Sequence, residues 1–303
     1  MDLRQLKTFQ TVAATLSFTR AAEQLDYAQS SVTAQVRALE DELGVQLFDR
    51  LGRRVTLTDA GERLLDYAEK MLKLADEAAL ALAESSEPTG KLIIAAPETL
   101  STYRLPPLLK QFRTRYPRVQ LILRSFLVPE TLARLADGSV DVAVLLTDAP
   151  PDSNGLMIVP LVEEHLLLLA APEHHLNDGG CVQPDDLRDE SLLLTEAGCS
   201  YRGAFENRLL ARGVRPTTTM EFGSVEAIKQ CVMANLGLTL LPEIAVCSEV
   251  NQGKLVALPW FEPDFHMGTR LIWHKDKWLS PALQEFIRLS EEILIKPTME
   301  RQA

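Results

Sequence analysis

The longest helical pattern in this sequence lies between residues 58 and 86, and it predicts a helix that packs along a partner. Thr58 offers an N-cap oxygen and Asp59 an acidic side chain for the first turn. Apolar residues then alternate at spacings of four and three, as the a and d positions of a coiled coil do. They are Leu64, Ala68, Met71, Ala75, Ala78 and Leu82. We expect a dimerising helix here, and the alternative is a core helix of one globular domain.

A polar segment, ESSEPTG at residues 84–90, follows this helix and is typical of a domain linker. The chain has 303 residues, a length that corresponds to about two domains. We therefore expect an N-terminal domain at residues 1–57, the helix and a hinge at 58–90, and a C-terminal domain at 91–303.

The composition excludes several classes of protein. With 46% hydrophobic and 24% charged residues, the chain is a globular sequence rather than a disordered or fibrous one. Its longest apolar run, Leu166 to Pro172, is far shorter than a membrane span. The first ten residues show no secretory signal. We expect no membrane association and a cytoplasmic location.

Catalytic and metal-binding motifs are not visible in the sequence. The histidines and the four cysteines show neither metal-ligand spacing nor a catalytic triad; the cysteines are Cys181, Cys199, Cys231 and Cys247. GxSxG, P-loop and HExxH patterns are absent as well. We therefore expect free thiols, no metal, no cofactor and no enzymatic activity.

The first 57 residues predict three helices and a hairpin. Apolar spacing favours a first helix within residues 3–16, a second at 18–25 and a third at 29–43, which Gly44 ends. A short basic hairpin at residues 47–57 follows. The whole chain has a net charge of −11, but residues 1–57 hold seven basic and seven acidic side chains. This segment can therefore present a basic face.

The second and third helices are joined by a few residues, as in a helix-turn-helix, whose second helix enters the major groove of DNA by its N-terminal part. The candidate DNA-binding residues on this helix are Gln29, Ser30, Ser31, Thr33, Gln35 and Arg37. The hairpin adds cationic side chains that can reach the phosphate backbone or the minor groove: Arg50, Arg53 and Arg54. A merely solvated helix face is the alternative for the helix residues.

The segment FTRAAEQLDYAQSSVTAQVRALEDELGVQLFDRLGRRVTLTDAG resembles the N-terminal signature of the LysR-type transcriptional regulators. Two later segments, ETLSTYRLPPLLKQFRTRYP and VEAIKQCVMANLGLTLLP, extend the resemblance over nearly the whole chain. It implies a multidomain α and α/β fold: a winged helix-turn-helix, a dimerising linker helix at 58–86, and a two-lobed α/β effector-binding domain similar to periplasmic binding proteins. It also implies a homodimer that assembles into a homotetramer on separated operator half-sites of double-stranded DNA.

Two residues of the third helix depart from the family pattern. A hydroxyl residue usually stands where this chain has Ala28, and a long polar or basic residue often stands at Ala34. These departures weaken the expectation of helix capping and of base reading at the two positions.

Short buried strands alternate with helices after residue 90, as in a parallel sheet flanked by helices. The pattern predicts lobe I at about residues 91–161 and 269–303 and lobe II at about 162–268, with crossings near 160–165 and 264–269. Two such lobes can close on a small ligand. We expect that ligand at the carboxyl ends of the strands, between the lobes.

The loop at residues 97–102 follows the first strand and opens a helix, so its amides and hydroxyls form a candidate anion site. The resemblance assigns effector contacts to Ser101 and Thr102, and simple helix capping is the alternative. Arg202 can pair with a ligand carboxylate, unless it pairs with Glu196 or Glu206. The expected effector-binding residues are Ser101, Thr102, Val128, Thr147, Ser200, Tyr201, Arg202 and Ser224. Together they favour a small anionic metabolite.

Three hypotheses for the function follow from these features. The leading one is a DNA-binding regulator that a small metabolite switches. A small-molecule-binding or catalytic α/β protein whose N-terminal helices only oligomerise is the second, and the basic hairpin argues against it. A periplasmic solute-binding protein is the third, and the missing secretory signal argues against it. Cys199 is either packed or, as in some family members that sense oxidants, a reactive thiol.

Overall fold

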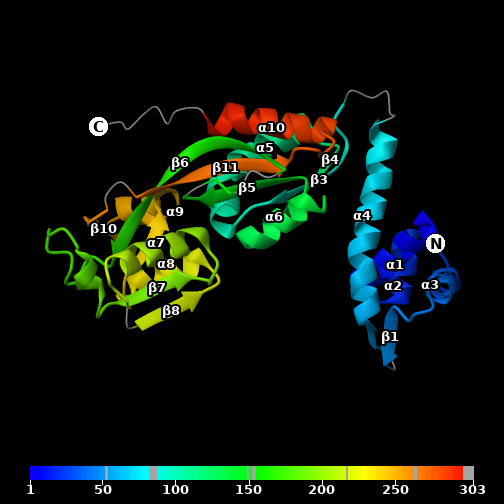
Figure 1. The fold of residues 1–303 in the computed structure, drawn as a ribbon, viewed down its shortest axis with the longest axis horizontal. Coiled ribbons are helices and arrows are strands. Elements are labelled where there is room, and N and C mark those ends of the chain that lie inside the picture. The colour runs from blue at the N-terminus through cyan, green and yellow to red at the C-terminus, as the bar shows by residue number, and fades with distance from the viewer. Residues whose placement is uncertain are drawn as a thin grey trace. The chain divides into compact units, whose positions relative to one another are not determined.

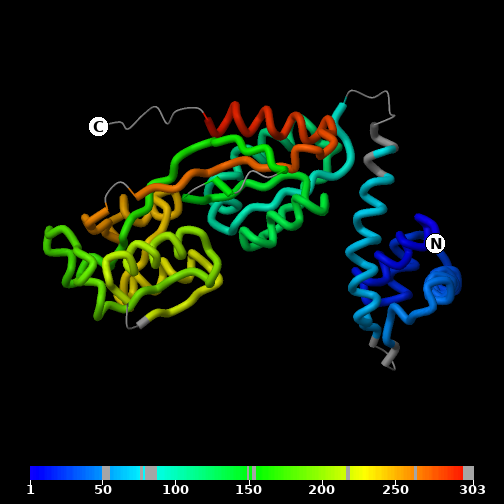
Figure 2. The backbone as a smooth tube through the Cα atoms, in the orientation of Figure 1, coloured from blue at the N-terminus to red at the C-terminus, as the bar shows by residue number. Residues whose placement is uncertain are grey.

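The computed structural model describes residues 1–51, 54–81, 87–148, 150–151, 155–215, 218–262 and 265–295. The chain divides into two compact units, Met1–Ser85 and Ser86–Ala303 (Figures 1 and 2). None of the helices within the described ranges combines the length and the apolar character that a bilayer crossing requires.

The N-terminal unit consists of helices and one hairpin: α1 (Leu3–Thr15), α2 (Phe18–Leu25), α3 (Gln29–Leu43), β1 (Phe48–Leu51), β2 (Arg54–Leu57) and α4 (Asp59–Ala81). The second and third helices predicted from the sequence are confirmed with the same boundaries. Local signals set them. Asp2 forms a capping box with Gln5 at the start of α1, Ser17 caps α2, and Gly44 ends α3 in the left-handed region at φ 68°.

The apolar faces of these helices meet in one core, which includes Leu6, Phe9, Val12, Ala21, Val32, Val36, Leu39, Phe48 and Ala68. Glu40 is buried beside this core. Its carboxylate accepts hydrogen bonds from the backbone N–H groups of Leu47, at 2.8 Å, and Phe48, at 3.3 Å. These bonds satisfy otherwise buried backbone groups and hold the hairpin against α3.

The heptad stripe of α4 is divided between two roles. Leu64 and Ala68 pack against the core of the N-terminal unit. Met71 of the stripe is exposed instead, with an exposed fraction of 39%, and so are Tyr67 and Leu74 outside the predicted stripe, with 61% and 67%. The stripe was expected to face a partner along its whole length, but its first turns serve the unit's own core. The free apolar face of α4 begins at Tyr67.

The C-terminal unit is built on a seven-stranded sheet with the order β10-β6-β11-β5-β3-β4, in which β9 also pairs with β6. Its strands are β3 (Gly90–Ala95), β4 (Val119–Arg124), β5 (Val142–Thr147), β6 (Leu156–Ala170), β9 (Thr239–Pro242), β10 (Val256–Leu258) and β11 (His266–His274). Strands β3, β4 and β5 are parallel. A second sheet pairs β7 (Ser191–Thr195) with β8 (Thr218–Phe222), also in parallel.

Two long strands, β6 and β11, carry the chain between the lobes (Figure 1). They pair antiparallel from His266 opposite His165 to His274 opposite Leu156. The sequence predicted only a short strand from His165, after a crossing near residues 160–165. That prediction was wrong, because β6 is one continuous strand from Leu156. The first part of β6 contains Pro160 and polar residues, so the apolar pattern of the sequence did not indicate a strand there.

Helices cover both faces of the sheet. They are η1, a π-helix (Leu100–Arg104), α5 (Pro106–Arg115), α6 (Val128–Ala136), η2, a 3-10 helix (Pro184–Leu187), α7 (Ser200–Ala211), α8 (Val225–Met233), α9 (Glu243–Asn251) and α10 (Pro281–Leu294). Alternate residues of β5 enter different cores: Val144 packs with the residues of α5 and α10, and Ala143 packs with Leu135 of α6. Helix α9 and strand β10 were not predicted.

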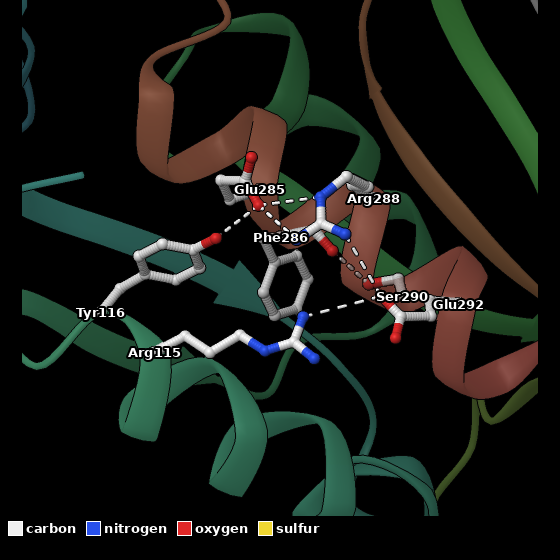
Figure 3. Close-up of polar contacts among 7 residues, drawn as sticks. All are labelled: Arg115, Tyr116, Glu285, Phe286, Arg288, Ser290 and Glu292. Carbon is white, nitrogen blue, oxygen red and sulfur yellow. Dashed lines mark hydrogen bonds and ion pairs between the residues drawn. The ribbon is translucent and has the colours of Figure 1, made fainter. Parts of the chain in front are cut away.

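A hydrogen-bonded network holds α10 on α5 (Figure 3). The Tyr116 hydroxyl donates to Glu285 at 2.5 Å, and Arg288 donates to the same carboxylate at 2.7 and 2.9 Å. Arg288 also donates to Glu292 at 3.2 Å, and Arg115 lies 3.6 Å from Glu292. Hydrogen bonds from Arg288 and Tyr116 lower the pKa of Glu285. The network fastens the last helix to lobe I.

Candidate DNA-binding helix and ligand cavity

The exposed side of α3 brings four of the predicted DNA-binding residues together. Gln29, Ser30, Thr33 and Arg37 line one shallow groove with Ala34, and Ala38 and Asp41 complete it. These positions lie on one face because they are spaced by one, three and four residues. The opposite face of the helix is buried in the core, so the groove is the side of α3 that is open to a partner.

Two predicted residues of α3 lie outside this groove. Ser31 is exposed but does not line it. Gln35 is half-buried, and its Oε1 accepts a hydrogen bond from the Thr8 hydroxyl of α1 at 2.7 Å. This hydrogen bond links α3 to α1 and engages the amide oxygen of Gln35, while the predicted contact of Gln35 with DNA stays a prediction. The position of Gln35, three residues after Val32 on the buried face, was the available signal for this link.

The start of α3 lacks a side-chain cap, as the departure at Ala28 indicated. Ala28 is the N-cap residue in extended conformation, and its methyl group accepts no hydrogen bond. Its backbone oxygen still accepts from the N–H groups of Ser31 and Val32. The uncapped N-terminus leaves amide groups beside Gln29 for water or for a phosphate.

The hairpin of β1 and β2 is antiparallel, with Leu51 opposite Arg54. Arg53 lies outside the described residues. Arg50 and Arg54 belong to the strands, but their side chains are not among those described. The predicted contacts of these three arginines with DNA therefore remain predictions.

A cavity of about 290 Å³ lies between the two lobes of the C-terminal unit. Lobe I contributes the loop after β3, with Pro97, Glu98 and Thr99, and residues 125–128 after β4. Lobe II contributes residues 195–196 and 198–201 at the end of β7 and after it, and residues 222–225 at the end of β8 and after it. All four segments follow the carboxyl ends of parallel strands, which is the usual ligand position in open α/β sheets. The volume suits a small molecule.

Half of the predicted effector residues line this cavity: Val128, Ser200, Tyr201 and Ser224. Ser101, Thr102, Thr147 and Arg202 do not. The Ser101 hydroxyl donates to the Ala96 carbonyl at 3.4 Å, and Thr102 is exposed. Thr99, the residue before the π-helical turn at residues 100–104, lines the cavity instead. Thr147 is buried, and its Oγ1 accepts from Arg270 at 2.6 Å.

Arg202 is engaged with other residues of lobe II. Its guanidinium donates to Glu206 at 2.9 Å, to Glu221 at 2.6 Å and to the Thr195 carbonyl. The pairing with Glu206 was the alternative that the sequence left open. Burial lowers the pKa of Arg202, but the hydrogen bonds to the two carboxylates outweigh this effect and raise it overall. Arg202 therefore has no free pair of neighbouring N–H groups with which to bind a ligand carboxylate.

One contact between the lobes lies at the wall of the cavity. The Tyr201 and Thr99 hydroxyls lie 3.4 Å apart, and burial raises the pKa of Tyr201. Nearby, the buried Lys229 of α8 pairs with Glu249 at 2.7 Å and with Glu226 at 2.9 Å. Desolvation lowers the pKa of Lys229, but these hydrogen bonds raise it overall. Lys229 is thus a satisfied cation rather than a free one.

The loop at the cavity is anchored through η1. Arg104 donates to both oxygens of the buried Glu164 of β6, at 2.7 and 2.6 Å. Thr269 of β11 donates to the same carboxylate at 3.3 Å. A bidentate pair of this kind holds a fixed geometry. It ties η1, and with it the loop at residues 97–99, to the strands that join the lobes.

The carboxylates of Glu98, Glu130 and Glu196 line the cavity, and no lysine, arginine or histidine is among its described lining residues. Burial raises the pKa of Glu98, and a hydrogen bond from the backbone N–H of Val225 lowers it in part. Cys199 also lines the cavity, is half-buried and has a free thiol. Whether it reacts with oxidants stays a prediction.

One cluster among the described residues has the side chains of a metal site, namely His174, His175 and Glu190. The sequence did not predict that these histidines meet a carboxylate. His174 Nδ1 accepts the N–H of Leu176 at 3.2 Å, so neutral His174 carries its proton on Nε2, which lies 3.4 Å from Glu190. That nitrogen is the one a metal would need. The cluster fits a histidine–carboxylate contact better than a metal site.

Comparisons with known proteins match both units. The family model of bacterial regulatory helix-turn-helix proteins of the lysR family covers residues 3–62, and the LysR substrate binding domain covers residues 85–294. The HTH-type transcriptional regulator YwqM of Bacillus subtilis is 43% identical over 293 residues, which are 96% of this chain and 99% of that protein. GltR of the same organism is 33% identical over 95% of both chains.

Solved structures of full-length regulators are similar as well. A variant of OxyR from Pseudomonas aeruginosa has a TM-score of 0.69 and 28% identity, covering 96% of this chain and 94% of its own. CbnR in complex with its target DNA has a TM-score of 0.70 and 25% identity, covering 96% and 99%. The winged helix-turn-helix and the two-lobed α/β domain expected from the sequence are confirmed.

Proposed function

This chain belongs to the LysR family of bacterial helix-turn-helix transcriptional regulators, and we propose that it reads its operator through the α3 groove and responds to a small molecule in the cavity between its lobes. The family consists of regulators rather than enzymes. The observation that carries the proposal is the groove of α3, in which Gln29, Ser30, Thr33 and Arg37 are gathered on the open face of a helix whose other face is buried.

The residues of the groove divide into two roles. Gln29 can read a base edge through its amide, because a glutamine side chain matches the hydrogen-bonding edge of adenine. Arg37 stands two turns further along α3, and a guanidinium there suits a phosphate contact. Ser30 and Thr33 can contact either. Arg50, Arg53 and Arg54 of the hairpin would add backbone contacts beside the groove.

The exposed apolar face of α4 supports the proposed assembly. Tyr67, Met71 and Leu74 have no cover within the described part of the N-terminal unit. A homodimer through the helix at residues 58–86 would bury them, and two such dimers would form a homotetramer on separated half-sites. In this arrangement, a ligand that favours one lobe geometry alters the spacing or bend of the bound DNA.

The sequence favoured an anionic effector, but Ser101 and Arg202, which supported this choice, form hydrogen bonds elsewhere, and Thr102 is exposed. Ser101, Thr102 and Arg202 do not line the cavity. Val128, Ser200, Tyr201 and Ser224 remain as proposed contacts for the body of the ligand. The charge of the ligand must therefore be inferred from the polar side chains that do line the cavity.

Footprinting upstream of the protein's own gene tests the proposed function. We expect the full chain to protect two separated half-sites, and Gln29→Ala to weaken that protection. Ser31→Ala is the matched control, because Ser31 is exposed on the same helix but lies outside the groove. A chain that protects no sequence, and whose gel shifts do not distinguish operator from random DNA, would contradict the assignment.

A further inference from the structure

We propose that the molecule bound in the cavity between the lobes carries a protonated amine on an apolar body, with the amine held by the carboxylates of Glu98 and Glu196. This inference rests on the proposed function in one respect, that the cavity is the effector site. It concerns the charge and shape of the ligand.

The lining of the cavity carries charge of one sign. Glu98, Glu130 and Glu196 line it, and its described lining residues include no lysine, arginine or histidine. An anionic ligand would face like charges without a cation to offset them. A cationic ligand would form charge-assisted hydrogen bonds, which are stronger than neutral ones.

Two arginines on the helices that carry lining residues, Arg134 of α6 and Arg202 of α7, are already paired. Arg134 donates to Glu130 at 2.9 Å, and this pair neutralises one of the three lining carboxylates. Arg202 is held by Glu206 and Glu221. Turning either cation toward a ligand would leave its present carboxylate partners without a counter-charge.

Lys229 is committed in the same way, to Glu226 and Glu249. It acts on Glu98 only as a weaker charge at longer range. Glu98 and Glu196 form no ion pair with any residue that the structure describes, so these two lining carboxylates are left to bind a cation. Glu98 is half-buried and Glu196 is exposed, and we therefore place the stronger contact at Glu98.

The position of Glu196 is constrained by Gly223. A Cβ atom on Gly223 would stand 3.0 Å from Glu196 Oε1, so the carboxylate lies directly against the loop after β8. That loop lines the cavity as well. Glu98 approaches the same region from lobe I, where its carboxylate accepts the Val225 N–H at the start of α8. The two carboxylates thus flank the cavity from different lobes.

The rest of the lining is suited to an apolar body. Phe126, Leu127, Leu146, Phe222 and Val225 supply aromatic and aliphatic surface. Leu127 of lobe I packs over Gly198 of lobe II, where a Cβ atom would come within 3.1 Å of its Cδ1. This contact closes the cavity around a compact molecule rather than a long one.

One polar atom of the lining also remains open. Thr195 Oγ1 is buried and forms no hydrogen bond of good geometry with the described residues, although the Tyr201 hydroxyl lies near it. A buried hydroxyl without a well-placed partner is costly, and a ligand donor or acceptor would satisfy it. The ligand is therefore expected to carry a polar group near Thr195.

Calorimetry on the full chain tests this inference with pairs of probes that share an apolar body and carry head groups of opposite charge. Phenethylamine is compared with hydrocinnamate, and isopentylamine with isocaproate, because the two members of each pair have closely similar apolar bodies. We expect the amines to bind and the acids not to bind. Glu98→Gln should weaken amine binding by about tenfold or more, the effect of losing a hydrogen bond to a charged group. Glu196→Gln should weaken it less.

Two controls keep the result interpretable. Glu98→Asp keeps the charge and should retain most of the binding, which excludes a mere folding defect. Glu173→Gln removes an exposed carboxylate that does not line the cavity and should have no effect. Preferential binding of the acids, or binding of neither series, would overturn the proposal.

Operator binding by the same preparation, without any probe, reports the proposed function separately. A chain that binds its operator but not the amines disproves only the charge assignment. A chain that binds the amines but no DNA disproves the regulatory role and leaves the charge assignment standing.

Discussion

The hydroxyl of Tyr201 lies 3.4 Å from the hydroxyl of Thr99, and this contact joins the two lobes at the wall of the ligand cavity. Both side chains are buried, with exposed fractions of 5% and 3%. Thr99 belongs to the loop after β3 and Tyr201 to the first turn of α7, so the pair reports directly on the closure of the lobes.

A double-mutant cycle of Tyr201→Phe and Thr99→Val should reveal coupling between these residues. Each change removes one hydroxyl, and the pair interacts by about 0.5–1 kcal/mol, as a long neutral hydrogen bond does. The measurement is the free energy of unfolding in urea. Strictly additive effects would mean that the two hydroxyls do not interact in solution.

Gln29→Ala should cost about 1–3 kcal/mol in binding to the operator and relax the preference at one base pair. The reason is that we expect the Gln29 amide, on the open face of α3, to read a base edge. Binding is measured on a panel of operators with single substitutions. Gln35→Ala should instead lower the stability of the N-terminal unit, because it breaks the hydrogen bond from Thr8. Equal changes in base preference for the two variants would contradict these roles.

Arg37→Ala and Arg53→Ala should weaken binding to all DNA sequences alike. Loss of one phosphate contact lowers the slope of log affinity against log salt by up to about one. Titrations at several salt concentrations on operator and random DNA measure this slope. A selective loss on the operator alone would assign base reading to these arginines.

Met71→Glu should dissociate the dimer without unfolding the chain. Met71 is exposed in the single chain, so a carboxylate there is harmless until a partner helix buries it. Analytical ultracentrifugation measures the oligomeric state, and Met71→Leu is the matched control that keeps the apolar contact. An unchanged oligomeric state of the Met71→Glu variant would contradict the proposal that α4 forms the dimer interface.

The unfolding free energy should depend on pH through Glu98. Burial raises the pKa of this carboxyl above its ordinary value of 4.5, so the folded state binds the proton more tightly than the unfolded state. At a pH above the raised pKa of the folded state, ionised Glu98 therefore destabilises the fold. This cost disappears as the pH falls from that pKa to the unfolded value of 4.5. Glu226 raises the pKa of Glu98 further and Lys229 lowers it, and both effects are smaller than that of burial.

Glu98→Gln should accordingly be more stable than the natural chain at neutral pH, and the difference should vanish in acid. Urea unfolding of both chains across the pH range tests this. A difference that is constant with pH, or one that grows in acid, would show that Glu98 does not titrate as described.

The sequence by itself determined the elements of the N-terminal unit. The boundaries of α2 and α3 follow from Ser17, from Gly44 and from apolar spacing, all of which act within a few residues of the chain. The alternation of strands and helices after residue 90 likewise determined the α/β class. Capping residues and the spacing of apolar residues can be read directly from the sequence, so these elements could be predicted.

The tertiary structure decided which of the predicted effector residues line the cavity and which do not. Thr99 lines the cavity and Ser101 does not, and Arg202 of α7 pairs with Glu221 of β8. The polar stretch of β6 became a strand because β11 pairs with it. The partner of a side chain depends on which distant segments of the chain lie beside it. The periodicity of apolar residues indicates that one face of an element is buried, but not which residues that face contacts.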